Sequence, residues 1–152
     1  MLESLGATLV YAVMGLGLLV LGYVLIDLLT PGHLGRALVG DVGDAEDGER
    51  RGRGPSYGAA VILSSSILAN GLVIFTALWT NVAAGLGTAV LWTLVFGVLG
   101  LVLQAVAFVL VDAVVPGKLA DVIFEHDRVH PAAWVMASAH LAVAGIVAAS
   151  IA

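Results

Sequence analysis

Four long stretches of the 152-residue chain contain no Asp, Glu, Lys or Arg and are long enough to cross a lipid bilayer. A membrane-spanning helix needs about 20 mainly apolar residues, because each residue covers about 1.5 Å of a hydrocarbon layer about 30 Å thick. Each stretch is predicted to be a helix, since lipid cannot satisfy backbone groups and the alternating pattern of a barrel strand is missing. The predicted spans are Leu5–Ile26, Gly58–Trp79, Thr88–Val111 and Ala132–Ile151.

The composition agrees with a single integral membrane domain over residues 1–152. Hydrophobic residues make up 61% of the chain and charged residues 11%, against about 45–50% and about 25% in soluble proteins. The first ten residues, MLESLGATLV, have no basic region before the apolar run, so an uncleaved first span is expected rather than a signal peptide. Cysteine is absent, which removes disulfides and thiolate ligands.

The basic residues predict the orientation of the chain. All six lie in the connections after the first and third spans, and the connection TNVAAGLGT contains none. By the positive-inside rule, loops 27–57 and 112–131 are cytoplasmic and both termini lie outside, in the cytoplasmic (inner) membrane. Ten of the eleven acidic residues share those loops or their edges, and a surface of such mixed sign gives no reason to expect a nucleic-acid partner.

Two similar segments end the first and third spans. LIDLLTPGHLGRAL at 25–38 and LVDAVVPGKLADVI at 110–123 share five identities. Their common motif contains Pro31, Gly32, Pro116 and Gly117. The chain is therefore predicted to be two tandem helix–loop–helix repeats, 5–80 and 88–152, inserted in the same sense about an axis along the bilayer normal. The first loop is eleven residues longer, and the excess is assigned to a flexible charged insert at 40–54.

A short interfacial amphipathic helix is predicted after each of these prolines, since proline is favoured in a first helical turn. Leu119, Val122 and Ile123 share one face of the second, and Leu34, Ala37 and Leu38 form a weaker face in the first. These helices either carry the chain sideways to the next span or dock a partner or gate.

This arrangement resembles a bacterial multi-pass family of the cytoplasmic membrane known as domain of unknown function 350. The resemblance rests on the repeated Asp-x-x-x-Pro at the ends of spans one and three and on the small residues that begin spans two and four. The family typically has an Asn followed by alanines at those two starts, whereas this chain has Pro55 and Pro131 nearby. The resemblance implies the architecture and leaves the biochemical activity open.

Polar side chains within the spans are candidate functional residues, because they are costly in hydrocarbon. Gln104, His140 and Ser66, with Ser64 and Ser65, are predicted to form one polar layer across the bundle. The layer acts either as hydrogen-bonded contact between helices or as a path for a proton or solute. Asp27 and Asp112 close their spans at the cytoplasmic interface, where they either pair with loop residues or form the acidic mouth of a cation pathway.

Enzyme and cofactor signatures are missing, so neither a catalytic activity nor a cofactor is expected. The cluster of Glu125, His126, Asp127 and His130 lacks a second ligand pair of known spacing, so a solvated loop is expected there rather than a metal site. Glycines that permit close helix contacts occur at Gly15, Gly17, Gly22, Gly85, Gly87, Gly97, Gly100 and Gly145.

The leading functional hypothesis is a membrane protein that acts by association, as a homo-oligomer or with an unknown membrane or cytoplasmic partner. The alternative is a small ion or solute channel.

Overall fold

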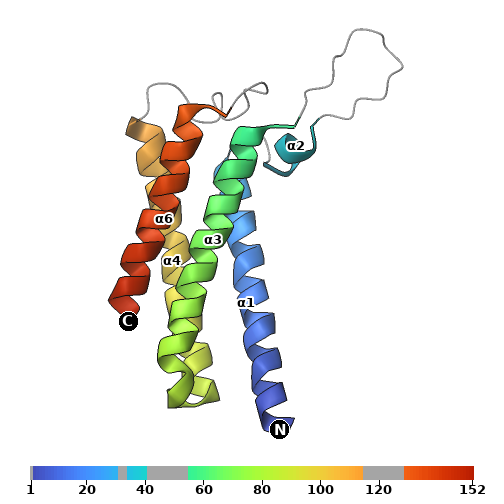
Figure 1. Cartoon of the computed structure of the whole chain (residues 1–152), viewed down its shortest axis with the longest axis vertical. Coiled ribbons are helices and arrows are strands. Elements are labelled where there is room, and N and C mark those ends of the chain that lie inside the picture. The colour runs from blue at the N-terminus through green and yellow to red at the C-terminus, as the bar shows by residue number, and fades with distance from the viewer. Residues whose placement is uncertain (1, 31–33, 41–54, 115–128) are drawn as a thin grey trace, which may run out of the picture.

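Four long helices form the protein in a computed structural model that describes residues 2–30, 34–40, 55–114 and 129–152 (Figure 1). Each is long and apolar enough to cross a membrane, which confirms the four predicted spans with ends moved by a few residues. The long helices are α1 (Leu2–Leu29), α3 (Tyr57–Asn81), α4 (Leu86–Val114) and α6 (Pro131–Ile151). The chain is therefore an all-helical, multi-pass transmembrane protein.

Two short elements lie in the described parts of the connections between these helices. Helix α2 (Leu34–Val39) follows the first span where a short helix is predicted, and Gly40, at φ 77°, ends it in the left-handed conformation that glycine tolerates. The 3₁₀ turn η1 (Val82–Ala84) joins α3 to α4. The predicted partner of α2 in the second half, the two Pro-Gly motifs and residues 41–54 of the charged insert lie outside the described residues.

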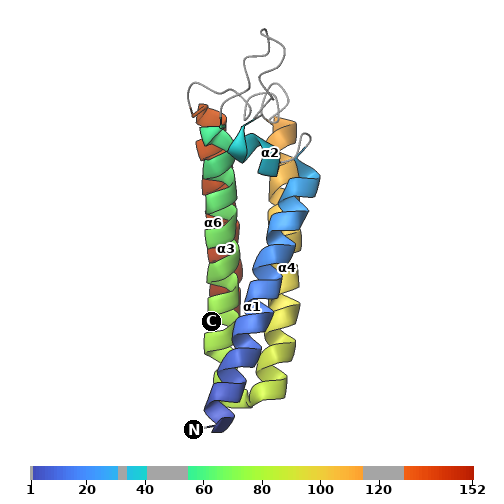
Figure 2. The same cartoon turned by 90° about the vertical axis from the view of Figure 1, so that its right-hand side faces the viewer.

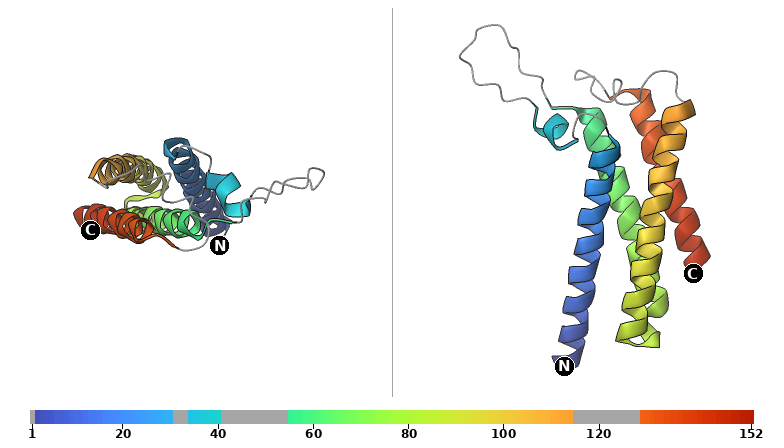
Figure 3. Two further views of the ribbon diagram at one scale, coloured as in Figure 1. Left: turned by 90° about the horizontal axis from the view of Figure 1, so that it is seen from above. Right: turned by 180° about the vertical axis from the view of Figure 1, so that it is seen from behind.

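The long helices alternate in direction. Helices α1 and α4 run toward the end of the bundle that carries α2, whereas α3 and α6 run away from it (Figures 1 and 2). Helix α3 packs against all three other long helices. Seen from above, α3 and α6 lie beside each other on one side, with α1 and α4 on the other (Figure 3).

Side chains cap the first turns of α3 and α6, the two helices that run away from the α2 end. Ser56 Oγ accepts a hydrogen bond from the Ala59 amide at 3.2 Å, and His130 Nδ1 accepts one from the Ala132 amide at 3.2 Å. Such caps satisfy amides that lack a partner in the first turn. Ser56 and His130 thus supply the acceptors that cap the starts of α3 and α6.

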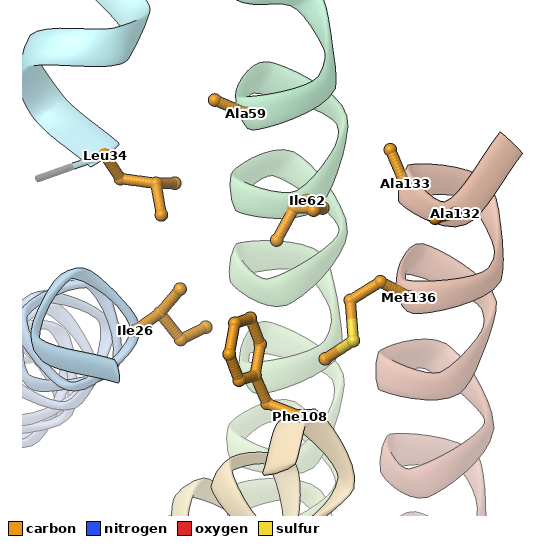
Figure 4. Packing of buried hydrophobic residues seen from close by; sticks show 8 residues of the cluster. All are labelled: Ile26, Leu34, Ala59, Ile62, Phe108, Ala132, Ala133 and Met136. Atoms are coloured by element: carbon orange, nitrogen blue, oxygen red, sulfur yellow. The ribbon is translucent and has the colours of Figure 1, made fainter. Parts of the chain in front are cut away.

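An apolar cluster closes the α2 end of the bundle (Figure 4). It gathers side chains from α1, α2, α3, α4 and α6, with the small residues of α3 and α6 allowing close approach. Its buried members are Ile26, Leu34, Ala59, Ile62, Phe108, Ala132, Ala133 and Met136. A smaller cluster of Ala69, Val73, Ala144 and Val147 lies further along α3 and α6.

Much of the outer surface is apolar. Large exposed side chains line every long helix, including Val13 at 70% exposure and Ile146 at 70%. In the most apolar 18-residue stretch of each helix, 17% of α1 is buried inside the protein and 44% of α3 is. Helix α1 therefore leaves more of its surface uncovered than α3 does. Such a surface is stable in contact with hydrocarbon rather than with water, so this fold requires a lipid bilayer around it.

Candidate functional site

Buried polar side chains gather along the inner face of α3 and on the helices that face it. Ser65, Ser66 and Asn70 lie on α3, Gln104 lies on α4 and His140 lies on α6. All five are at most 6% exposed, and His140 is fully buried. Polar groups at this depth are shielded from bulk water, so their contacts determine what the site can do.

Two adjacent serines of α3 connect the three helices of the site. Ser66 Oγ donates to Gln104 Oε1 at 3.4 Å, which joins α3 to α4. Ser65 Oγ lies 3.5 Å from His140 Nδ1, which joins α3 to α6. The structure thus brings Ser66 to Gln104, whereas His140 contacts the neighbouring serine. Ser64, the third serine of the run, is exposed on α3 and stands outside this network.

Asn70 is a member of the site that sequence reasoning missed. Its Nδ2 donates to the Leu18 carbonyl oxygen at 3.0 Å and so joins α3 to α1. The space for the amide comes from Gly22, where a Cβ atom would lie 2.7 Å from Asn70 Nδ2. Gln104 was identified because it is an amide side chain within an uncharged span. The same criterion identifies Asn70.

Four buried polar atoms have no hydrogen-bond partner among the described residues. They are Asn70 Oδ1, Thr93 Oγ1, Gln104 Nε2 and His140 Nε2. Leaving such an atom unpaired costs on the order of 1–3 kcal/mol. Two of the four belong to Gln104 and His140, which contact Ser66 and Ser65, and a third belongs to Asn70, one helical turn further along α3.

The two acidic residues at the helix ends lie apart from this network. Asp27 is half-buried near the end of α1, and its Oδ1 accepts from the Gly35 amide of α2 at 3.4 Å. Asp112 is exposed near the end of α4. Both are at the end of the bundle that carries α2 (Figure 1), and Asp27 has a local role in holding α2.

Metal chemistry receives no geometric support from the part of the chain that the structure describes. Within it, no three His, Cys, Asp or Glu residues come together as a metal site requires. His130 caps α6 through Nδ1. Glu125, His126 and Asp127, the other members of the loop cluster, lie outside the described residues.

Comparison with known proteins finds one family over nearly the whole chain. The family model described as Domain of Unknown Function (DUF350) matches residues 1–151. A UPF0719 transmembrane protein of Mycolicibacterium paratuberculosis is 30% identical over 150 residues, which cover 99% of this chain and 89% of the relative. UPF0719 transmembrane proteins of Mycobacterium bovis and Mycobacterium tuberculosis are 31% identical, with the same coverage.

No solved structure matches this chain.

Proposed function

The chain belongs to the DUF350 family of transmembrane proteins, and we propose that it acts by self-association in the cytoplasmic membrane, through a contact face on α6. The observation that carries the proposal is a stripe of small residues on the outward side of this helix. Ser138, Ala142, Gly145 and Ala149 are all exposed. We call these four residues the α6 stripe.

The open space around Gly145 sets the α6 stripe apart from glycines that pack inside the protomer. A Cβ atom at Gly145 would meet nothing within 4 Å, whereas one at Gly97 would lie 2.7 Å from Leu18. Glycine lowers helix stability by about 1 kcal/mol relative to alanine. Internal packing explains Gly97 and leaves Gly145 unexplained, and close approach of a second helix backbone is the usual reason for small residues on a membrane helix.

The spacing of the α6 stripe suits a second copy of the same helix. Its members follow at intervals of four, three and four residues, the pattern of a left-handed helix pair. Ser138 Oγ donates to the Trp134 carbonyl oxygen of its own helix at 2.8 Å, so the hydroxyl does not oppose an apolar contact. Copies inserted in one sense would present parallel α6 helices, which gives a symmetric dimer contact.

Disulfide trapping in membranes tests this proposal. The chain contains no cysteine, so any disulfide between copies must come from the introduced residue. We expect Ala142→Cys and Gly145→Cys to form dimers under mild oxidation. Val13→Cys, at an equally apolar and 70% exposed position of α1, is the control and is expected to stay monomeric. Monomers at both α6 positions, or equal trapping at Val13, would count against the α6 contact.

A solute or ion pathway is the second candidate function. The unpartnered Gln104 and His140 atoms favour it, because conduction requires polar groups within the membrane. The proposed mouth is Asp27 and Asp112. Flux into liposomes that exceeds empty vesicles and falls in Asp112→Asn and His140→Ala variants would support the pathway, and flux equal to that of empty vesicles under several gradients would exclude it.

The proposal also includes the orientation and the internal repeat. The parallel directions of α1 and α4 support two like-oriented hairpins, and the six basic residues support a cytoplasmic location for the α2 end. No catalytic step forms part of the proposed function.

A further inference from the structure

The hydrogen bonds of the Ser65 hydroxyl indicate which nitrogen of the His140 ring carries the proton. Ser65 Oγ donates to the Ile62 carbonyl oxygen at 2.8 Å and also lies 3.5 Å from His140 Nδ1. A serine hydroxyl has a single proton. Because Ile62 receives that proton, the contact with the ring requires Nδ1–H to donate to Ser65. The neutral ring then carries its proton on Nδ1 and a lone pair on Nε2.

Gln104 on α4 carries unused donors that complement the free lone pair of His140. Ser66 Oγ donates to Gln104 Oε1, so the two protons on Gln104 Nε2 are unused, and this nitrogen is buried without a partner. Ser65 and Ser66 are adjacent, with Cα atoms about 3.8 Å apart. The residue with the unused acceptor, His140 on α6, and the residue with the unused donor, Gln104 on α4, therefore each contact one of two adjacent serines of α3.

Asn70 adds a second acceptor one helical turn further along α3. Its Nδ2 is used by the Leu18 carbonyl oxygen, and its Oδ1 is buried without a partner. The side chain is 1% exposed. Besides Thr93 Oγ1 on α4, the interior thus offers two unused acceptors, His140 Nε2 and Asn70 Oδ1, and one unused donor group, Gln104 Nε2.

This combination selects the chemistry of a ligand. A metal cation would face the protons of the Gln104 amide, and an anion would face the lone pairs of His140 and Asn70. A neutral hydroxylic molecule can both donate and accept, and water is the smallest of these. Buried water in proteins typically makes about three hydrogen bonds, to donors and acceptors alike.

We propose that the interior between α3, α4 and α6 binds water, which accepts a hydrogen bond from Gln104 Nε2 and donates one to His140 Nε2. Asn70 Oδ1 is the further acceptor on the side of α1. The site lies near the middle of the bundle, since His140 and Ser66 are each about ten residues into their helices. It gives His140 a partner for proton exchange within the membrane and does not depend on association through the α6 stripe.

Water-edited solid-state NMR of the wild-type protein in lipid bilayers tests the proposal, with ¹⁵N-labelled histidine and ¹³C-labelled methionine methyl groups. We expect the His140 ring to be protonated at Nδ1 and unprotonated at Nε2, and to receive polarisation from water. Met136 is the internal control. It is fully buried one turn earlier on α6, in the apolar cluster, and its methyl group is expected to receive none.

The histidine signals can be assigned in two independent ways. His140→Gln removes the signal of interest, and if that variant does not fold, single replacements of His33, His126 and His130 identify it by elimination. A proton on Nε2 in place of Nδ1 would overturn the proposal. Water transfer to His140 as low as that to Met136 would also overturn it.

A variant then tests the role of Gln104. Gln104→Leu removes the donor at similar volume, and we expect the transfer of polarisation from water to His140 to slow at least twofold. Thr76→Val is the matched control, because the Thr76 hydroxyl bonds to Leu72 within α3 and lies outside the site. Unchanged transfer in Gln104→Leu would contradict the assigned partner.

Discussion

Individual glycines decide how closely the helices of this protein pack. At Gly22 a Cβ atom would lie 2.7 Å from Asn70 Nδ2 and 2.9 Å from Leu101, and at Gly100 one would lie 3.0 Å from Val73. Neither neighbour of Gly22 can move freely, because Asn70 is held by its bond to Leu18 and both side chains are buried. At Gly17, on the same helix, nothing lies within 4 Å.

This difference predicts opposite results for the same change at two positions of α1. Gly22→Ala should lower the free energy of unfolding by about 1–3 kcal/mol, because the added methyl group overpacks the contact with α3 and α4. Gly17→Ala should leave it unchanged or raise it by up to about 1 kcal/mol, through helix propensity. Unfolding by SDS titration in mixed micelles measures both. Equal losses in the two variants would show that α1 packs differently.

The polar residues show how far a residue-level prediction could reach. The charge-free spans made Gln104, His140 and Ser66 conspicuous, because any polar side chain there is unusual. The hydrogen-bond pairs could not be predicted from the sequence. Whether Ser65 or Ser66 faces His140 depends on the rotation of α3 about its axis, because side chains at neighbouring positions of a helix point about 100° apart. Asn70 carried the same signal, but its acceptor is the Leu18 backbone carbonyl, a group that sequence patterns do not reveal.

At the scale of elements, α2 is held by a few specific contacts. Leu34 is fully buried in the apolar cluster beside Ile26 (Figure 4). The Ala37 carbonyl oxygen accepts from the Ser56 amide at 2.8 Å, and Asp27 Oδ1 accepts from the Gly35 amide. These contacts attach α2 to the end of α1 and the start of α3.

Truncating the buried side chain of α2 should therefore destabilise the whole bundle. We expect Leu34→Ala to cost about 2–5 kcal/mol, because it removes apolar contacts and leaves a cavity. Val39→Ala, at a 70% exposed position of the same helix, should change stability by less than about 0.5 kcal/mol. Thermal unfolding in detergent compares the two. A Leu34→Ala variant as stable as Val39→Ala would mean that α2 is not part of the core.

The existence of the elements was more predictable than their packing. Span length and lack of charge locate α1, α3, α4 and α6, since hydrocarbon thickness imposes both. The faces by which they meet could not be predicted in the same way, because lipid-facing and core-facing positions are both apolar. On α4, for example, Leu101 is buried and Leu103 is exposed, although the residues are identical.

At the scale of the whole molecule, charge placement and helix direction lead to one arrangement. The end of α1, the start of α3, the end of α4 and the start of α6 lie at one end of the bundle. All six basic residues fall in the two connections between these helix ends. The proposed orientation, which would put Asp27 and Asp112 on the cytoplasmic side, rests on this arrangement, and the proposed parallel α6 contact requires copies inserted in that one sense.

Labelling of single cysteines in sealed spheroplasts tests that arrangement most directly. Gly48→Cys marks the connection after the first span, and Ala84→Cys marks the exposed turn between α3 and α4. A membrane-impermeant maleimide should label Ala84→Cys in intact spheroplasts and Gly48→Cys only after permeabilisation, because the connections that hold all six basic residues are proposed to face the cytoplasm. Labelling of both positions from the same side would contradict the account of two like-oriented hairpins.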